Sequence, residues 1–196
     1  MRRIDAREVL AEELEAMLAE MPLGKVRVTE LCRRAGATPP TFYRYFRDKH
    51  ELVAWVFVRD FVGAYDGHGP GYSAERLDGA MAAMESRAGF YKAAWADRSQ
   101  NSIAEYIQEF NLQIAGDAVR RATGRGLTRG QELEVRYHSF GVVCLFMEWL
   151  AKGMPATRAE LARLMMEKTP AFLAEAFAAF PYDPDELLAM AQRPGA

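Results

Sequence analysis

Hydrophobic residues recur every three or four positions along most of the chain, which is the spacing of one buried face of an α-helix. The first such segment, residues 4–21, ends before Pro22 and Gly24, which interrupt helices. A second helix is predicted in residues 28–35 and a longer one in residues 49–65. Nowhere do hydrophobic and polar residues alternate as in a half-buried strand. The pattern therefore predicts an all-α fold.

The same spacing continues from Ser73 to the end of the chain. It predicts helices in residues 75–96, 102–123, 132–152, 158–168, 171–180 and 183–192. Between Phe140 and Leu150 only Glu148 is charged, so helix 132–152 is apolar on almost every side. Such a helix is buried on several sides, and we infer that a partner subunit covers one of them. Cys144, within this run, is expected to be a small buried hydrophobic residue.

The two groups of helices are separated by Gly67-His68-Gly69-Pro70-Gly71. Glycine- and proline-rich segments are typical of domain boundaries. We therefore expect one domain in residues 1–65 and a larger helical domain in residues 72–196.

The segment around residues 36–40 has the features of a helix-turn-helix. Gly36 is placed to end the preceding helix in a left-handed conformation, and Thr38 is placed to cap the next one. Pro39 and Pro40 then occupy the first turn, where their missing amides would be unpaired anyway. The second helix of such a motif enters the DNA major groove. The sequence thus predicts an N-terminal three-helix, helix-turn-helix DNA-binding domain, followed by a larger helical dimerisation and effector domain.

Charge is distributed unevenly and supports this interpretation. The whole chain has a net charge of −2, but residues 25–50 contain seven Lys/Arg and two Asp/Glu, a local charge of +5. The remaining residues therefore carry −7. This asymmetry is expected of a nucleic-acid-binding region attached to an acidic body.

The residues of this region resemble the N-terminal domain of the TetR/AcrR (tetracycline-repressor-like) family. The resemblance rests on Thr29-Glu30-Leu31-Cys32-Arg33-Arg34-Ala35-Gly36-Ala37-Thr38 and on Thr41-Phe42-Tyr43-Arg44-Tyr45-Phe46-Arg47-Asp48-Lys49-His50-Glu51-Leu52. Residues 90–94, 100–102 and 141–153 resemble the C-terminal domain of the subgroup that contains dihydroxyacetone-kinase operon regulators. The resemblance implies a homodimer, a palindromic operator and control by a small molecule or, in some members, by a partner protein.

Two positions depart from the family pattern. Pro39-Pro40 stands where many members have Lys-Gly, which removes a lysine able to reach phosphate or base. Arg27 replaces the more usual threonine before the second helix, so the capping of that helix is altered.

Candidate DNA contacts follow from the resemblance and from side-chain chemistry. Tyr43 and Lys49 correspond to phosphate contacts, which position a protein without selecting sequence. Arginine suits guanine, and hydroxyl or methyl groups suit several bases. Arg33 and Arg34 flank this surface, and either DNA contact or simple solvation fits them. The predicted DNA-binding residues are Arg27, Thr29, Thr38, Pro39, Thr41, Tyr43, Arg44, Tyr45 and Lys49.

The C-terminal helices contain aromatic residues together with a few polar groups, the composition of a small-molecule pocket. Aromatic residues at helical spacing also fit an ordinary core, so both interpretations stay open. The candidate effector-pocket residues are Tyr91, Trp95, Tyr106, Phe110, Asn111, Tyr137, His138, Phe140 and Met147.

Other classes of function find little support. The sequence has no Gly-x-Ser-x-Gly, phosphate-binding loop or HExxH motif, so we expect no catalytic residues and no cofactor. His50 and His68 are expected to be exposed, and no metal site is predicted. Cys32 and Cys144 lack a paired spacing, which fits a reducing cytoplasm. The longest apolar stretch is far shorter than the about 20 residues of a membrane span.

The predicted function is that of a sequence-specific DNA-binding transcriptional regulator, expected to be a ligand-responsive repressor. Helices 132–152 and 158–180 would pair across a two-fold axis as a four-helix bundle. The first alternative is a co-regulator or activator whose C-terminal domain binds a partner protein, and the second is a structural or enzymatic domain with an incidental helix-turn-helix. A closed cavity with polar groups favours a small molecule, whereas an exposed apolar groove favours a protein.

Overall fold

The computed structural model describes residues 5–63, 72–97, 103–153, 155–179 and 183–191. These residues form eleven α-helices, one short 3-10 helix and no strand, which confirms the predicted all-α fold. The helices are α1 (Ala6–Glu20), α2 (Val28–Arg34), α3 (Pro39–Tyr43), α4 (Lys49–Gly63), α5 (Ala74–Ser86), α6 (Ala88–Trp95), α7 (Ile103–Thr123), α8 (Arg129–Lys152), α9 (Arg158–Glu167), α10 (Ala171–Ala179) and α11 (Pro184–Met190), with the 3-10 helix η1 at Leu23–Lys25.

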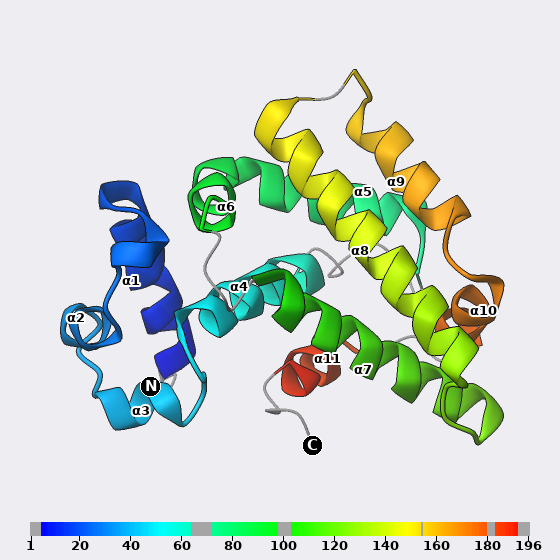
Figure 1. The fold of residues 1–196 in the computed structure, drawn as a ribbon, viewed down its shortest axis with the longest axis horizontal. Coiled ribbons are helices and arrows are strands. Elements are labelled where there is room, and N and C mark those ends of the chain that lie inside the picture. Colours follow the sequence, from blue (N-terminus) through cyan, green and yellow to red (C-terminus); the bar gives the residue numbers. More distant parts are fainter. Residues whose placement is uncertain (1–4, 64–71, 98–102, 154, 180–182, 192–196) are drawn as a thin grey trace.

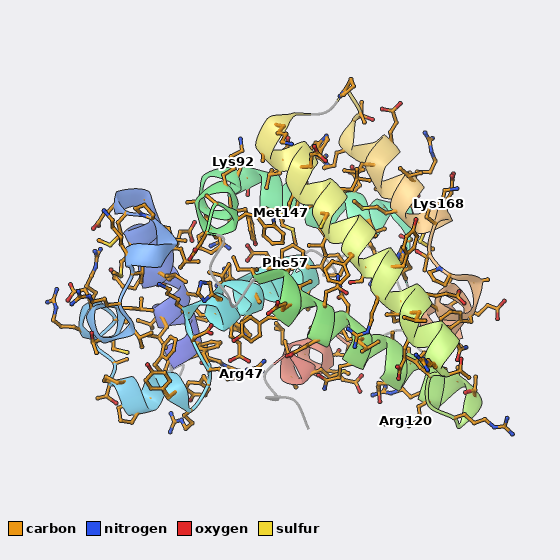
Figure 2. The ribbon with its side chains drawn as sticks, in the orientation of Figure 1. Arg47, Phe57, Lys92, Arg120, Met147 and Lys168 are labelled. Carbon is orange, nitrogen blue, oxygen red and sulfur yellow. The ribbon has the colours of Figure 1, made fainter. Side chains whose placement is uncertain are left out.

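Helix α4 connects the two ends of the molecule. In Figure 1, α1, α2 and α3 gather at one end and α8, α9 and α10 at the other, with α4 running from the first group into the middle. The glycine-rich segment after α4, including His68, lies outside the described residues. Figure 2 places Arg47 beside the N-terminal helices and Phe57 of α4 in the interior of the molecule. Helix α4 therefore links α1 to α5, α7 and α11.

Local hydrogen bonds explain where several helices begin. Thr128 and Gln131 form a capping box, so α8 starts at Arg129 instead of residue 132. The predicted helix 75–96 is wrong as a single helix, because the backbone at Arg87 (φ −113°, ψ 25°) leaves the helical conformation and separates α5 from α6. Helical spacing of hydrophobic residues did not reveal this break because both helices bury the same kind of face.

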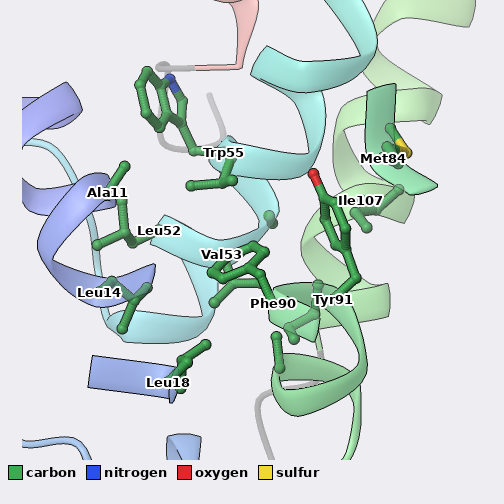
Figure 3. Close-up of a cluster of buried hydrophobic side chains, with 14 of the residues drawn as sticks. Ala11, Leu14, Leu18, Leu52, Val53, Trp55, Met84, Phe90, Tyr91 and Ile107 are labelled. Carbon is green, nitrogen blue, oxygen red and sulfur yellow. The ribbon is translucent and has the colours of Figure 1, made fainter. Parts of the chain in front are cut away.

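The N-terminal helices are held together by apolar side chains that α1 buries. Leu10 and Leu14 have no exposed surface, and they belong to one cluster with Phe42 of α3 and Leu52 of α4. Figure 3 shows Leu14 of α1 facing Leu52, with Phe90 of α6 nearby. Burying one such side chain stabilises a fold by roughly 1.5–3 kcal/mol. Because α3 has only five residues, it depends on this packing for its position.

A group of charged side chains fastens α6 to α4 and α1. The carboxylate of Asp60 accepts hydrogen bonds from the guanidinium groups of Arg59 and Arg87 and from the Tyr91 hydroxyl, the last at 2.6 Å. Arg59 also pairs with Glu8 of α1 at 2.6 Å. Burial raises the pKa of Tyr91, and the neighbouring Asp60 raises it further. The break at Arg87 brings both Arg87 and Tyr91 to this buried carboxylate.

One face of α8 has no cover from its own chain among the described residues. Leu133, Tyr137 and Phe140 are 60%, 86% and 45% exposed, and Cys144 continues the same face. The expectation that Cys144 is buried is therefore wrong for the single chain. The opposite face is buried, with Val143 only 3% exposed. Despite this apolar character, none of the described helices has the length and hydropathy that a bilayer span requires.

We predict opposite effects on stability for two glycine-to-alanine substitutions. Gly36 has φ +62°, so Gly36→Ala forces a side chain into the left-handed region and lowers the free energy of unfolding by about 1–2 kcal/mol. Gly116 lies within α7, where an added Cβ meets only the Leu127 Cδ1 atom at 3.8 Å. Gly116→Ala should raise the free energy of unfolding by roughly 0.5–1 kcal/mol. Urea unfolding measures both, and equal effects would contradict this account.

Candidate DNA-binding surface and interior cavity

The turn between α2 and α3 has the geometry that the sequence predicts. Gly36 adopts φ +62°, and the Ala37 amide donates to the Cys32 carbonyl at 2.9 Å. Thr38 caps α3, because its Oγ1 accepts a hydrogen bond from the Thr41 amide at 3.3 Å and lies 2.9 Å from the Thr41 hydroxyl. The start of α3 is thereby fixed by two hydroxyl-bearing side chains.

The outer surface of α3 combines aromatic and cationic groups. Phe42 is fully buried, whereas the next residue, Tyr43, is 59% exposed. Arg44 is also exposed, and its guanidinium lies 4.8 Å from the centre of the Tyr45 ring and donates to the Tyr45 hydroxyl at 2.9 Å. The guanidinium of Arg7 also lies against Tyr45, 5.6 Å from the ring centre. These contacts orient Arg44 before any ligand arrives.

Arg7 is a supporting residue that the sequence reasoning missed. Its guanidinium pairs with Asp5, the N-cap of α1, and lies 5.6 Å from the Tyr45 ring and 5.8 Å from the Trp55 ring. The side-chain hydrogen bond from Arg7 lowers the pKa of Asp5. The only sequence signal was an aspartate ahead of a helix, which indicates a cap but gives no link to Tyr45.

Lys49 has a structural role in addition to the predicted phosphate contact. Its Nζ donates to the carbonyl oxygens of Gly24 and Val26 at 3.2 and 3.0 Å, which fixes the turn before α2. Arg27 precedes α2 as its N-cap residue but makes no capping hydrogen bond, as the departure from the family pattern suggested. Arg27 and Thr29 are both exposed at this end of α2.

The two arginines at the end of α2 have acidic partners within the chain. Arg34 pairs with Glu13 and with Glu20 of α1, the latter at 2.8 Å, and Arg33 pairs with Glu30 at 2.6 Å. The hydrogen bond from Arg34 lowers the pKa of Glu20. These contacts favour a structural role for Arg34, which joins α2 to α1, over the alternative of DNA contact.

A polar junction anchors the start of α4. The Asp48 carboxylate accepts hydrogen bonds from the amides of His50 and Glu51 at 2.8 and 3.0 Å, and from the Tyr106 hydroxyl of α7 at 2.9 Å. The Nε2 atom of His50 lies 3.1 Å from Asp97. His50 is 7% exposed, so the expectation that it is exposed is wrong. The side chain was misjudged because its partner Asp97 lies 47 positions away in sequence.

Arg47 adds a second contact between this junction and α7. Its guanidinium pairs with Glu109 at 2.9 Å and lies 4.6 Å from the centre of the Tyr106 ring. Burial, followed by the hydrogen bond to Asp48, raises the pKa of Tyr106. The segment between α3 and α4 is therefore tied to the C-terminal helices by both charge and ring packing.

A cavity of about 160 Å³ lies between the C-terminal half of α4 and helices α5, α7, α8, α10 and α11. Its wall is mostly apolar, with the aromatic side chains of Phe57, Phe61, Tyr72, Phe110 and Phe177. Burial raises the pKa of Tyr72, so its hydroxyl stays protonated at neutral pH. The cavity has the composition of a small-molecule site.

Four polar side chains also line the cavity: Arg76, Asn111, His138 and Ser139. Asn111 Nδ2 donates to the Ser139 hydroxyl oxygen. Burial lowers the pKa of His138, although a hydrogen bond to the Lys168 backbone opposes that shift. His138 is therefore uncharged at neutral pH.

The structure places three of the nine predicted effector-pocket residues on the cavity wall, namely Phe110, Asn111 and His138. The other six point elsewhere, because helical spacing identifies a hydrophobic face without showing what that face meets. Tyr91 and Tyr106 bond to Asp60 and Asp48, Trp95 and Met147 pack in the main core, and Tyr137 and Phe140 are exposed on α8. Sequence reasoning missed Phe57 and Phe61, although their spacing of four on α4 was visible.

Comparison with known proteins identifies the N-terminal region. The model for "Bacterial regulatory proteins, tetR family" matches residues 10–56, from α1 to the middle of α4. The chain carries a tetR-family DNA-binding domain. This tetR-family segment contains all nine predicted DNA-binding residues, and the protein is a DNA-binding transcriptional regulator.

Two further comparisons, with curated proteins and with solved structures, do not extend this assignment beyond the N-terminal region. No curated protein matches this chain significantly. A solved structure, "Dihydroxyacetone kinase operon activator DhaS", is similar over 92% of this chain and 100% of its own, with 15% sequence identity and a TM-score of 0.49. A likeness at this level defines neither a ligand nor a partner.

We predict that Arg44→Ala and Arg34→Ala separate DNA contact from structural support. Arg44→Ala should weaken binding to the operator by about 1–3 kcal/mol and relax preference at one base pair. Arg34→Ala should leave operator affinity unchanged but lower the midpoint of thermal unfolding, because it leaves Glu13 and Glu20 without their partner. Fluorescence anisotropy and thermal unfolding measure the two effects. Equal losses of affinity for the operator and for random DNA would assign Arg44 to phosphate contact.

Proposed function

We propose that this tetR-family protein is a homodimeric repressor that binds a palindromic operator and releases it when a small molecule occupies the cavity. Residues 1–65 would bind DNA, and residues 72–196 would form the dimer and bind the effector. Repression and the palindrome come from the family resemblance, whereas dimerisation and the effector have support in the structure.

The observation that supports control by an effector is the path of α4. Leu52 and Val53 pack in the cluster with α1 and α3, whereas Val58 and Val62, further along the same helix, line the cavity. A molecule that binds one arrangement of α4 more tightly shifts the population toward that arrangement. Because α3 packs on the same cluster as α4, the shift would change the position of the DNA-binding helix.

The exposed face of α8 supports the homodimer. Leu133, Tyr137, Phe140 and Cys144 follow one another at intervals of four, three and four, which places them on one side of the helix. Leu164 of α9 is also exposed, at 42%. A two-fold axis would bury these apolar groups against their copies, so that α8 and α9 of both chains form a four-helix bundle.

The composition of the cavity favours a small-molecule effector over the partner-protein alternative. It combines an apolar wall with Asn111, His138 and Ser139, which are suited to orient a ligand. The large exposed apolar groups on α8 and α9 are already assigned to the second copy in this proposal. A regulator that senses a protein would need a further apolar surface.

Selection of DNA from a random pool by the purified protein tests the proposed function directly. We expect a palindrome whose half-sites lie about one helical turn apart, or a multiple of it. Binding should weaken steeply as salt increases, because phosphate contacts release counterions. Enrichment of a single half-site, or binding without sequence preference, would refute a dimeric repressor of this kind.

We predict that Tyr137→Glu combined with Phe140→Glu produces a monomer. Two charges would be buried without partners at the proposed interface, which opposes association. Light scattering should show half the mass of the wild-type dimer, and the slope of operator affinity against salt should fall by about half because one DNA-binding domain remains engaged. Arg120→Gln, which removes an exposed charge on α7 outside the proposed interface, is the matched control. A dimeric double variant would show that the interface lies elsewhere.

A further inference from the structure

The cavity contains an uncharged hydrogen-bonding pair that determines what it accepts. Asn111 of α7 donates through Nδ2 to the hydroxyl oxygen of Ser139 of α8, and Ser139 is 5% exposed. Among the described residues, the Ser139 hydroxyl hydrogen and the Asn111 carbonyl oxygen have no further partner. The pair therefore offers one donor and one acceptor side by side, which is what a ligand hydroxyl group needs.

The side chains around the cavity favour an uncharged ligand. No Asp or Glu is among the described residues of the wall, so no carboxylate there would neutralise a cationic ligand. Arg76, the cation of the described wall, already takes part in another interaction within the chain. His138 is neutral because burial lowers its pKa, and its Nε2 atom lies 3.4 Å from the Thr169 hydroxyl. A carboxylate accepts hydrogen bonds but cannot donate one to the Asn111 carbonyl oxygen. An uncharged ligand fits these groups better.

The size and the wall of the cavity define the body of the ligand. Its volume of about 160 Å³ is close to that of an engineered apolar cavity, about 150 Å³, that binds benzene. Phe57, Phe61, Phe110 and Phe177 line this space with rings, and aromatic pairs attract each other beyond the effect of area burial. A single six-membered ring therefore fits the volume and matches the wall.

We propose that the cavity binds a small uncharged phenol, with its ring among the phenylalanines and its hydroxyl group at the Asn111–Ser139 pair. The phenol oxygen would accept a hydrogen bond from Ser139, and its O–H would donate to the Asn111 carbonyl oxygen. This inference rests on the proposed function, because it names the chemical class of the effector in the same cavity.

Isothermal titration of the full chain with four probes tests the ligand class. Phenol and 4-methylphenol should bind about tenfold more tightly than toluene, which lacks the hydroxyl group, since one hydrogen bond contributes about 1 kcal/mol or slightly more. Benzoate should bind more weakly than phenol. Tighter binding of benzoate than of phenol would overturn the proposal in favour of an anionic ligand near Arg76. Equal affinities for phenol and toluene would remove the role of the polar pair.

Variants locate the binding site and provide a control. Ser139→Ala and Asn111→Ala should each weaken phenol binding about fivefold to tenfold without changing toluene binding. Val142→Phe fills the cavity and should abolish binding of both. Arg136→Gln, exposed on the same helix, should change neither affinity. Unchanged phenol binding in Val142→Phe would place the phenol outside this cavity and overturn the proposal.

Operator binding, measured in parallel, separates this inference from the proposed function. A protein that binds its operator but none of the aromatic probes refutes the phenol proposal and leaves DNA binding intact. A protein that binds phenol through Ser139 and Asn111 and then releases the operator supports both. Phenol binding through this pair with no selective DNA binding supports the cavity assignment and refutes the proposed function.

Discussion

Both halves of α4 are packed against other helices, and the rest of this structure depends on that constraint. Eight of its side chains are buried, from His50 at the start to Val62 near the end. The first half packs with α1 and α3, and the second half lines the cavity. Because protein interiors are close-packed and carry few voids, neither half of α4 can shift without a response from the helices around it.

The polar junction at the start of α4 restricts the movement of this helix relative to α7. Asp48 satisfies the first amides of the helix and accepts the Tyr106 hydroxyl, while Arg47 reaches Glu109 on the same helix α7. A free helix end would have exchanged these groups with water at little cost. Here a displacement of α4 along or across α7 has to break hydrogen bonds to partly buried groups, each of which costs about 1–3 kcal/mol when left unpaired. The DNA-binding helices are therefore positioned relative to α7 as well as to α1.

Fewer cations of the N-terminal region are available to DNA than its local charge of +5 indicates. Arg33, Arg34 and Arg47 are paired with glutamates, so their charges are largely neutralised within the chain. Arg44 has no such acidic partner among the described residues and is held against the Tyr45 ring instead. Few cations per chain are thus available to phosphate, which is consistent with tight operator binding only when two copies act together.

Sequence alone predicted the elements whose causes are local. The conformation of Gly36, the Thr38 cap and the buried Phe42 all follow from chemistry within a few residues, and each is as expected. The cavity was only partly predictable because its wall comes from six helices, and periodicity does not show which faces meet. Tyr91 was assigned to the pocket from its spacing, yet its hydroxyl group is held by Asp60 at a sequence distance of 31.

Helix α8 shows why it matters for function which helix faces meet, which the sequence does not reveal. Ser139 and Val143 face the cavity, whereas Tyr137, Phe140 and Cys144 lie on the opposite, exposed side of the same helix. In the proposed dimer, the outer side of α8 is fixed by its copy, so a ligand that enlarges the cavity has to displace the other wall. That wall includes α4, which packs against the DNA-binding helices. In the proposed mechanism, the two faces of α8 would therefore direct the response to a ligand toward α4 and the DNA-binding helices instead of toward the dimer interface.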